Sequence, residues 1–175
     1  LADPRIVSLS DKAQAAFDEA NVLIIETDEI LDMTKAQMAL LSRPELQMFT
    51  GSERLTDFIG DDQRAVLEEG LAKRGLQLAL VDRMKPWMVT GLVALPACEL
   101  SRKQAGEPFL DIALAHHAKA AGKDIKGLET IVEQLDAMAS LPLEFHVQGL
   151  VETIRLGDAM DDVIETMIQL YIDEN

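Results

Sequence analysis

Near the start of the sequence lies Val22-Leu23-Ile24-Ile25-Glu26, a short apolar run of mainly β-branched residues that ends in a carboxylate. Such runs are typical of strands that are buried on both faces, as the strands of parallel sheets are. A second candidate strand, Asp124-Ile125-Lys126-Gly127-Leu128, is half polar. Because helical sequence precedes each segment, the two strands are predicted to be parallel.

Most of the remaining sequence has helical periodicity, with recognisable start and stop signals. Ser10 is a candidate N-cap, Pro44 ends a helical segment, and Gly75 and Gly122 are suitable residues for the position after a helix. Residues 28–123 form a thick helical insertion between the strands. The sequence therefore predicts a predominantly helical α/β fold with few short parallel strands. Helices are expected over residues 10–20, 28–41, 53–59, 60–75, 76–84, 86–96, 106–121, 129–139, 143–156 and 158–172.

Composition narrows the class of protein. A length of 175 residues favours one domain, and 48% hydrophobic with only 4% aromatic residues predicts a core of aliphatic side chains. A formal net charge of −15 without a Lys/Arg cluster disfavours nucleic-acid binding. The single cysteine, Cys98, excludes an internal disulfide and a cysteine-rich metal site. The sequence contains no apolar run long enough to span a membrane and no signal-peptide pattern.

Candidate site residues follow from the two strands. Ligands of open α/β sheets gather beyond the carboxyl ends of parallel strands, and Glu26 and Glu129 directly follow the two candidate strands. Two carboxylates at one sheet edge could bind a divalent cation or share a proton. Glu133 would lie one helical turn after Glu129 on the same face. Alternatively, glutamates in a first helical turn only complement the helix dipole.

The patterns around the histidines and the tryptophan do not indicate a catalytic or metal-binding role. His117 falls on an apolar helical stripe and is predicted to pack in or beside the core, while the adjacent His116 faces elsewhere. His146 has no second ligand at metal-binding spacing. The lone Trp87 is predicted to be a buried anchor.

Several blocks together resemble the middle of TraB/GumN proteins. The most specific is the stretch Gly127-Leu128-Glu129-Thr130-Ile131-Val132-Glu133-Gln134-Leu135, which is similar to the Gly-Leu-Glu-Thr-x-x-Glu-Gln element of that family. The Val22–Glu26 segment resembles the Val-Val-Glu strand of the family. Further matching blocks are Asp3-Pro4-Arg5, Lys85-Pro86-Trp87, Leu95-Pro96, Phe109-Leu110-Asp111 and Ala120-Ala121-Gly122-Lys123. The resemblance spans nearly the whole chain.

The resemblance implies a fold shared with Tiki-like proteases, erythromycin-esterase-like enzymes and the haem-binding ChaN group. It implies a metal-dependent hydrolase that acts on a peptide or small-molecule substrate with a divalent ion, and an exported or periplasmic location. Glu26 and Glu129 would be catalytic residues and metal ligands, with Glu133 and Gln134 as partners on the following helix.

The sequence departs from the family pattern at the histidines. The family site combines strand-end glutamates with two Gly-x-x-His motifs, but none of the three histidines has a glycine three positions earlier. The chain is therefore expected to be the central part of a larger domain, with one motif directly before Leu1 and the other after Asn175. The alternative is a binding protein without turnover, either a ChaN-like haem or iron carrier or a helical interaction module with an acidic surface.

Overall fold

The structure, a computed structural model, describes residues 1–157 and 159–173, apart from the side chain of Met33. Helices account for 67% of the described residues, which also form a two-stranded parallel sheet, so the predicted fold class is confirmed. The chain divides into two compact units. The first contains Leu1–Met38, Ala97–Ile131 and the residues from Asp162 onward, and the second contains Ala39–Pro96 and Val132–Asp161. The prediction of a single domain stays a prediction.

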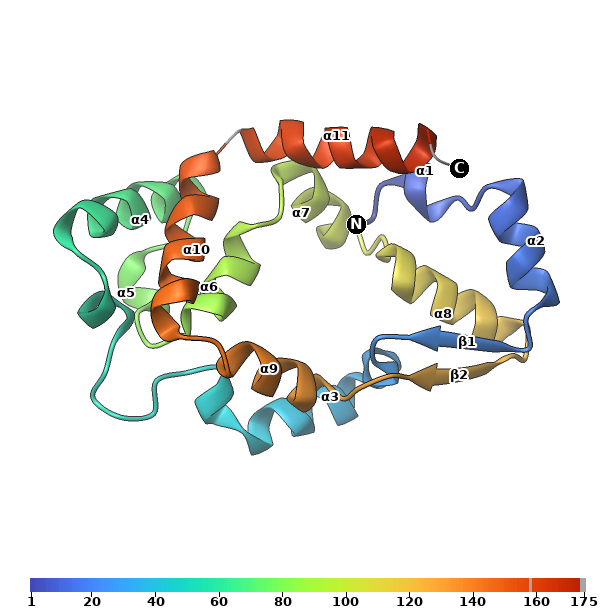
Figure 1. The fold of residues 1–175 in the computed structure, drawn as a ribbon, viewed down its shortest axis with the longest axis horizontal. Helices are drawn as coiled ribbons and strands as arrows, with labels where there is room; N and C mark the ends of the chain where they lie inside the picture. Colours follow the sequence, from blue (N-terminus) through green and yellow to red (C-terminus); the bar gives the residue numbers. More distant parts are fainter. Residues whose placement is uncertain (158, 174–175) are drawn as a thin grey trace. The chain divides into compact units, whose positions relative to one another are not determined.

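The first unit contains the sheet (Figure 1). Its described elements are α1 (Pro4–Val7), α2 (Asp11–Glu19), β1 (Val22–Ile25), the 3-10 helix η1 (Asp28–Leu31), the beginning of α3 (Met33–Ser42), α7 (Ala97–Gln104), α8 (Leu110–Ala120), β2 (Asp124–Gly127), the first residue of α9 (Ile131–Ala139) and most of α11 (Ala159–Asp173).

The second unit is helical. Besides the remaining parts of α3 and α9, its elements are the 3-10 helices η2 (Pro44–Leu46) and η3 (Leu55–Phe58) and the α-helices α4 (Asp61–Lys73), α5 (Leu78–Val81), α6 (Pro86–Val93) and α10 (Leu143–Leu156).

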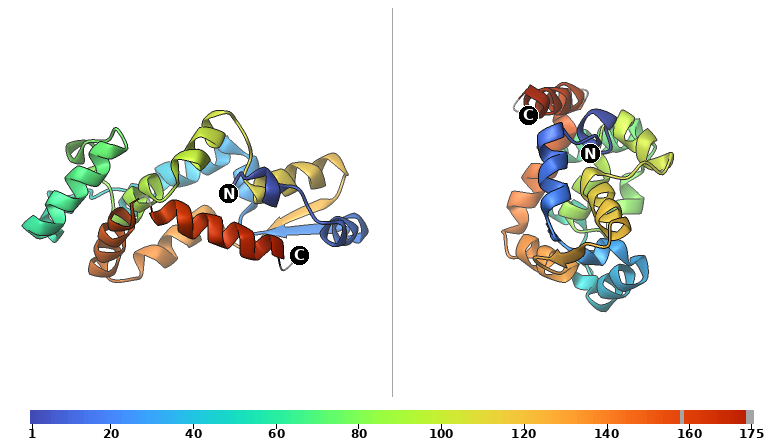
Figure 2. Two further views of the ribbon diagram at one scale, coloured as in Figure 1. Left: turned by 90° about the horizontal axis from the view of Figure 1, so that it is seen from above. Right: turned by 90° about the vertical axis from the view of Figure 1, so that its right-hand side faces the viewer.

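The sheet pairs β1 with β2 in parallel, with Val22 opposite Asp124 and Ile25 opposite Gly127. The two arrows point the same way in Figure 1, and α8 packs along both strands (Figure 2). The buried residues of α8 are all alanines, whose small side chains allow a helix to lie close to a sheet. Lys123 leads into β2 and donates hydrogen bonds to the carbonyls of Asp18 and Ala20, before β1.

One face of the sheet is exposed, which corrects the prediction that β1 is buried on both faces. Ile25 is buried, but Val22 is 37% exposed and Ile24 59% exposed. Successive side chains of a strand point to opposite faces, and α8 covers only one of them. The apolar run thus predicted the strand correctly but did not predict that one of its faces is exposed.

The N-terminal segment of the first unit is held by buried charges. The backbone N of Ala2 donates to Oε2 of the fully buried Glu99 at 2.6 Å. Arg102, one turn further along α7, pairs with Glu99 and with the buried Asp3, whose Oδ2 lies 3.0 Å from Arg102 Nη2. Hydrogen bonds from Arg5, above all, lower the pKa of Asp3 to about 2. A buried carboxylate stays charged where such donors replace water.

The second unit has a core of aliphatic side chains with one phenylalanine. Helix α10 packs against α6 and α4, and a Cβ on Gly70 of α4 would lie 2.1 Å from Cγ2 of Ile154 on α10. The glycine therefore sets how closely the two helices approach. Trp87 is buried as predicted, and its indole N donates to the carbonyl of Leu46 at 2.9 Å. The core residues are Phe49, Leu55, Leu67, Leu71, Leu78, Val81, Val89, Val93, Val147, Leu150, Val151 and Ile154.

Several helix ends were predicted correctly from local signals. The Ser10 hydroxyl accepts a hydrogen bond from Ala13 N and caps α2. Gly75 and Gly122 follow α4 and α8 with φ of 72° and 68°, a left-handed conformation that glycine adopts at little cost. Helix α10 has the predicted bounds.

Three helical predictions were wrong. The helix expected over 28–41 is interrupted at Asp32, because the Asp32 carboxylate accepts from the backbone N atoms of Thr34 and Lys35 and starts a new helix there. The helix expected over 76–84 is limited to α5, and α7 was not predicted. His117 is exposed and not packed, because α8 turns its alanines inward. The start of the helix expected from residue 158 lies outside the described residues.

Candidate functional site

The carboxyl end of the sheet brings the two predicted glutamates together through their backbones. The carbonyl oxygen of Glu26 accepts hydrogen bonds from Leu128 N at 3.1 Å and from Glu129 N at 2.9 Å. These contacts extend one residue beyond β1 and two residues beyond β2. The placement of Glu26 and Glu129 at one sheet edge is therefore as predicted from the sequence.

A glycine makes this close approach possible. A Cβ added to Gly127, the last residue of β2, would lie 2.7 Å from the backbone N of Asp28 and 3.3 Å from Cα of Thr27. Real side chains do not tolerate such a contact with backbone atoms, so the chains would have to separate. Because Gly127 has no side chain, the end of β2 can lie close to the turn after β1.

The site contains a third carboxylate, Glu29, which sequence reasoning missed. Glu29 belongs to η1 and is only 5% exposed, although it follows Glu26 by three residues. Its Oε2 accepts a hydrogen bond from Ile131 N at 2.8 Å, and its Oε1 lies 3.7 Å from Nζ of Lys35. The backbone N of Glu29 donates to the hydroxyl of the buried Thr27. Its position in the first turn after a strand is the one sequence signal that could have identified it.

The three carboxylates at the site differ in burial. The side chains of Glu26 and Glu129 are both exposed. The buried carboxylate is Glu29, because η1 folds back against β2. Solvent therefore reaches the predicted pair directly.

The predicted helix-face relation between Glu129 and Glu133 is wrong. Helix α9 begins at Ile131, so Glu129 lies before it, whereas Glu133 lies in its first turn. Two residues share a helix face at this spacing only if both are helical. Glu133 and Gln134 belong to the second unit, and their role as partners of the site stays a prediction.

The carboxylate oxygens of Glu26 and Glu129 are of a type that binds divalent cations such as Mn²⁺ or Mg²⁺. Exposed carboxylates are the ligands that such cations prefer, but a full shell takes about six to eight oxygen atoms. Within residues 1–157 and 159–173, no group of three or more His, Cys, Asp or Glu side chains is placed to hold a metal ion. Glu26 and Glu129 would thus supply part of a ligand set.

The histidines in the described residues have other surroundings. His116 and His117 are exposed on α8. His146 is buried in the second unit, where its Nε2–H donates to the carbonyl of Met138 at 2.8 Å and its ring lies 4.8 Å from that of Trp87. Its contacts are those of a packed core residue.

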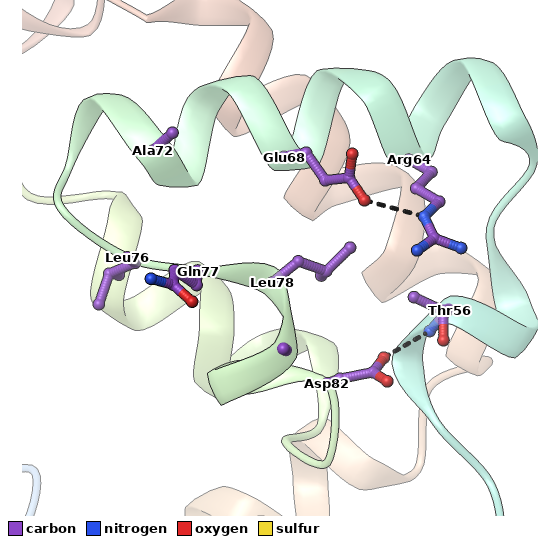
Figure 3. Close-up of a pocket in the computed structure, with 9 residues that line it drawn as sticks. Thr56, Arg64, Glu68, Ala72, Leu76, Gln77, Leu78 and Asp82 are labelled. Atoms are coloured by element: carbon purple, nitrogen blue, oxygen red, sulfur yellow. Dashed lines mark hydrogen bonds and ion pairs between the residues drawn. The ribbon is translucent and has the colours of Figure 1, made fainter.

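A separate groove lies in the second unit, between α4 and the segment from Leu76 to Asp82 (Figure 3). It has a volume of about 390 Å³. Arg64 pairs with Glu68 at 2.9 Å, and Asp82 accepts from Thr56 N at 3.0 Å. Dashed lines mark both contacts in Figure 3. The apolar part of the lining comes from Ala72, Leu76, Leu78 and Ala79.

A family model for TraB/PrgY/gumN proteins matches residues 1–175, the whole chain. The chain belongs to the TraB/PrgY/gumN family. No curated protein and no solved structure matches it. In this TraB/PrgY/gumN chain, the resemblance that the Gly127–Leu135 block suggested is thus confirmed.

Among the residues of this TraB/PrgY/gumN chain that the structure describes, no helix combines the length and the apolar character needed to cross a bilayer.

Proposed function

We propose that this chain supplies the carboxylate part of a divalent-cation-dependent hydrolytic site at the end of the β1–β2 sheet. The observation that carries the proposal is the hydrogen bond from Glu129 N to the carbonyl of Glu26, at 2.9 Å. It joins two strand-end glutamates that are 103 positions apart in the sequence. Both side chains are exposed, so they are accessible to an ion and a substrate from solvent.

The chemistry follows from the donor types. Glu26 and Glu129 are the residues that would hold the ion. A divalent cation held there would lower the pKa of a water molecule that it binds and would polarise a carbonyl or phosphoryl oxygen. Whichever of the two carboxylates did not coordinate the ion would be placed to accept a proton from water. The resemblance to the family implies a peptide or small-molecule substrate. It also implies that further metal ligands come from two Gly-x-x-His motifs, which residues 1–175 do not contain.

The test is a calorimetric titration of the chain with Mn²⁺. We expect weak, saturable binding, with Kd on the order of 10⁻⁴–10⁻³ M for so few carboxylate ligands. Glu26→Gln and Glu129→Gln keep the size of the side chain but remove its charge, and each should weaken this binding by at least about tenfold.

The matched control is Glu107→Gln, which removes the same charge from an exposed loop position before α8. It should leave the titration unchanged, because the general attraction of cations by a chain of net charge −15 is then almost the same. If all three variants weakened Mn²⁺ binding equally, the binding would be due to the net negative charge of the chain and not to a specific site. No binding by the unaltered chain would refute the proposal.

The second candidate function is a helical interaction module without turnover. It is favoured by the groove of the second unit, which combines an apolar lining with the charged side chains of Arg64, Glu68 and Asp82. This candidate predicts no saturable Mn²⁺ binding that depends on Glu26, so the titration distinguishes the two functions.

A further inference from the structure

Glu29 is a buried carboxylate with an unusual position beside the proposed site. At 5% exposure it has lost most of its hydration, which is costly for a charged group unless hydrogen bonds or counter-charges replace the water. Its two oxygens have different partners. Oε2 accepts from Ile131 N at 2.8 Å, while Oε1 faces Lys35 Nζ at the longer distance of 3.7 Å.

The partner on Oε2 is the first residue of α9. The first N–H groups of a helix have no acceptor within the helix, and the helix N-terminus carries a partial positive charge. A carboxylate at this point satisfies one of these donors and fits the helix dipole. The contact spans 102 positions in the sequence, from the turn after β1 to the start of α9.

The short segment between β2 and α9 is consequently held at both ends. At its beginning, Leu128 N and Glu129 N donate to the carbonyl of Glu26. At its end, Ile131 N donates to Glu29. Glu129 belongs to the first attachment and lies two residues before the second. Gly127 allows the turn after β1 to come close enough for both. Holding both ends restricts the backbone of Glu129 more than the strand pairing alone would.

We propose that Glu29 is a positioning residue of the site: its carboxylate fixes the start of α9 and thereby keeps Glu129 beside Glu26. Glu29 matters for metal binding only if the proposed function is correct. The restraint on the backbone of Glu129, in contrast, follows from the hydrogen bonds whatever the function is. Glu29 itself accepts from the backbone and is buried, so it acts through Glu129 and not on a bound ion.

The experiment compares Glu29→Met with Glu29→Gln. Methionine keeps the length of the side chain but has no strong acceptor, whereas the glutamine oxygen can still accept from Ile131 N. We expect Glu29→Met to accelerate amide hydrogen exchange at Glu129 and Ile131 by about tenfold or more relative to Val151 in α10, and to weaken Mn²⁺ binding similarly. Glu29→Gln should restore most of both. Lys35→Ala, which removes the more distant partner, should change neither.

A second variant removes the donor in place of the acceptor. Ile131→Pro deletes the N–H at the first position of α9, where proline is well tolerated in a helix. Its effect on Glu129 exchange should match that of Glu29→Met, and the double variant should add nothing further, because both remove one hydrogen bond. This variant provides the test if Glu29→Met does not fold.

The outcomes separate the two proposals. Unchanged exchange at Glu129 in either single variant would overturn the positioning role. If exchange changes as expected but the unaltered chain binds no Mn²⁺, Glu29 fixes the backbone and the proposed function fails. If Mn²⁺ binding depends on Glu26 yet is the same in Glu29→Met, the site exists without the help of Glu29.

Discussion

The second unit packs its helices around aliphatic side chains, whereas the first unit buries charged and polar groups beside alanines. Within the described residues, the buried polar side chains of the first unit are Asp3, Thr27, Glu29 and Glu99, and the second unit has His146 alone. Apolar burial is non-directional and tolerates small shifts, but a buried carboxylate requires donors at hydrogen-bond distance. The first unit is thus more specifically determined by individual contacts, and it contains the proposed site.

This contrast predicts where truncation of a side chain costs most. Leu150 of α10 is fully buried in the second unit, so Leu150→Ala should lower the free energy of unfolding by about 2–5 kcal/mol. Urea unfolding followed by the fluorescence of Trp87, the one tryptophan of the chain and part of the same unit, would measure the loss. Leu80→Ala is the control, because Leu80 is 70% exposed and its loss should matter little. Similar costs for both variants would contradict the apolar core.

The charged contacts of the first unit predict a dependence on pH. The pKa of Asp3 is lowered from 3.8 to about 2, so the ionised form stabilises the folded chain. This contribution, on the order of 2 kcal/mol, is fully present above about pH 4 and is lost as the pH falls towards 2.

Asp3→Asn should therefore flatten this part of the stability profile in acid unfolding followed by circular dichroism. Asp111→Asn, at an exposed position on α8, should leave the profile parallel to that of the unaltered chain. An unchanged acid limb in Asp3→Asn would show that the network around Arg5 and Arg102 does not favour the ionised carboxylate.

Two glycines sharpen the comparison at the level of the backbone. A Cβ on Gly127 would collide with the backbone of Asp28, so Gly127→Ala should destabilise the first unit by about 1–2 kcal/mol. Gly149 in α10 has open space, so Gly149→Ala should stabilise its helix by up to about 1 kcal/mol. Hydrogen exchange of amides in β1 and α10 would measure both effects separately. Stabilisation by both substitutions would show that the turn after β1 can move away from β2.

Local sequence patterns were sufficient to predict the strands, most helices and the family. Val22–Ile25 predicted a strand because β-branched runs of this length favour extended backbone, and parallel pairing with the Asp124–Gly127 segment followed from the preceding helices. Local capping signals, such as Ser10 and Gly122, fixed helix ends because their physical effect extends over only a few residues. The strand-end position of Glu26 and Glu129 followed from the same reasoning.

Which carboxylate is buried could not be read from the sequence. The first turn after a strand marks Glu29 as a candidate, but the contacts that bury it, with β2 and with Ile131, come from residues far along the chain. The exposure of Ile24 and His117 was not predicted for a related reason. The spacing of apolar residues and the composition do not show which face of a strand or helix another element covers. Contacts between distant segments depend on three-dimensional approach, such as the one that Gly127 permits, and local pattern contains no information about that distance.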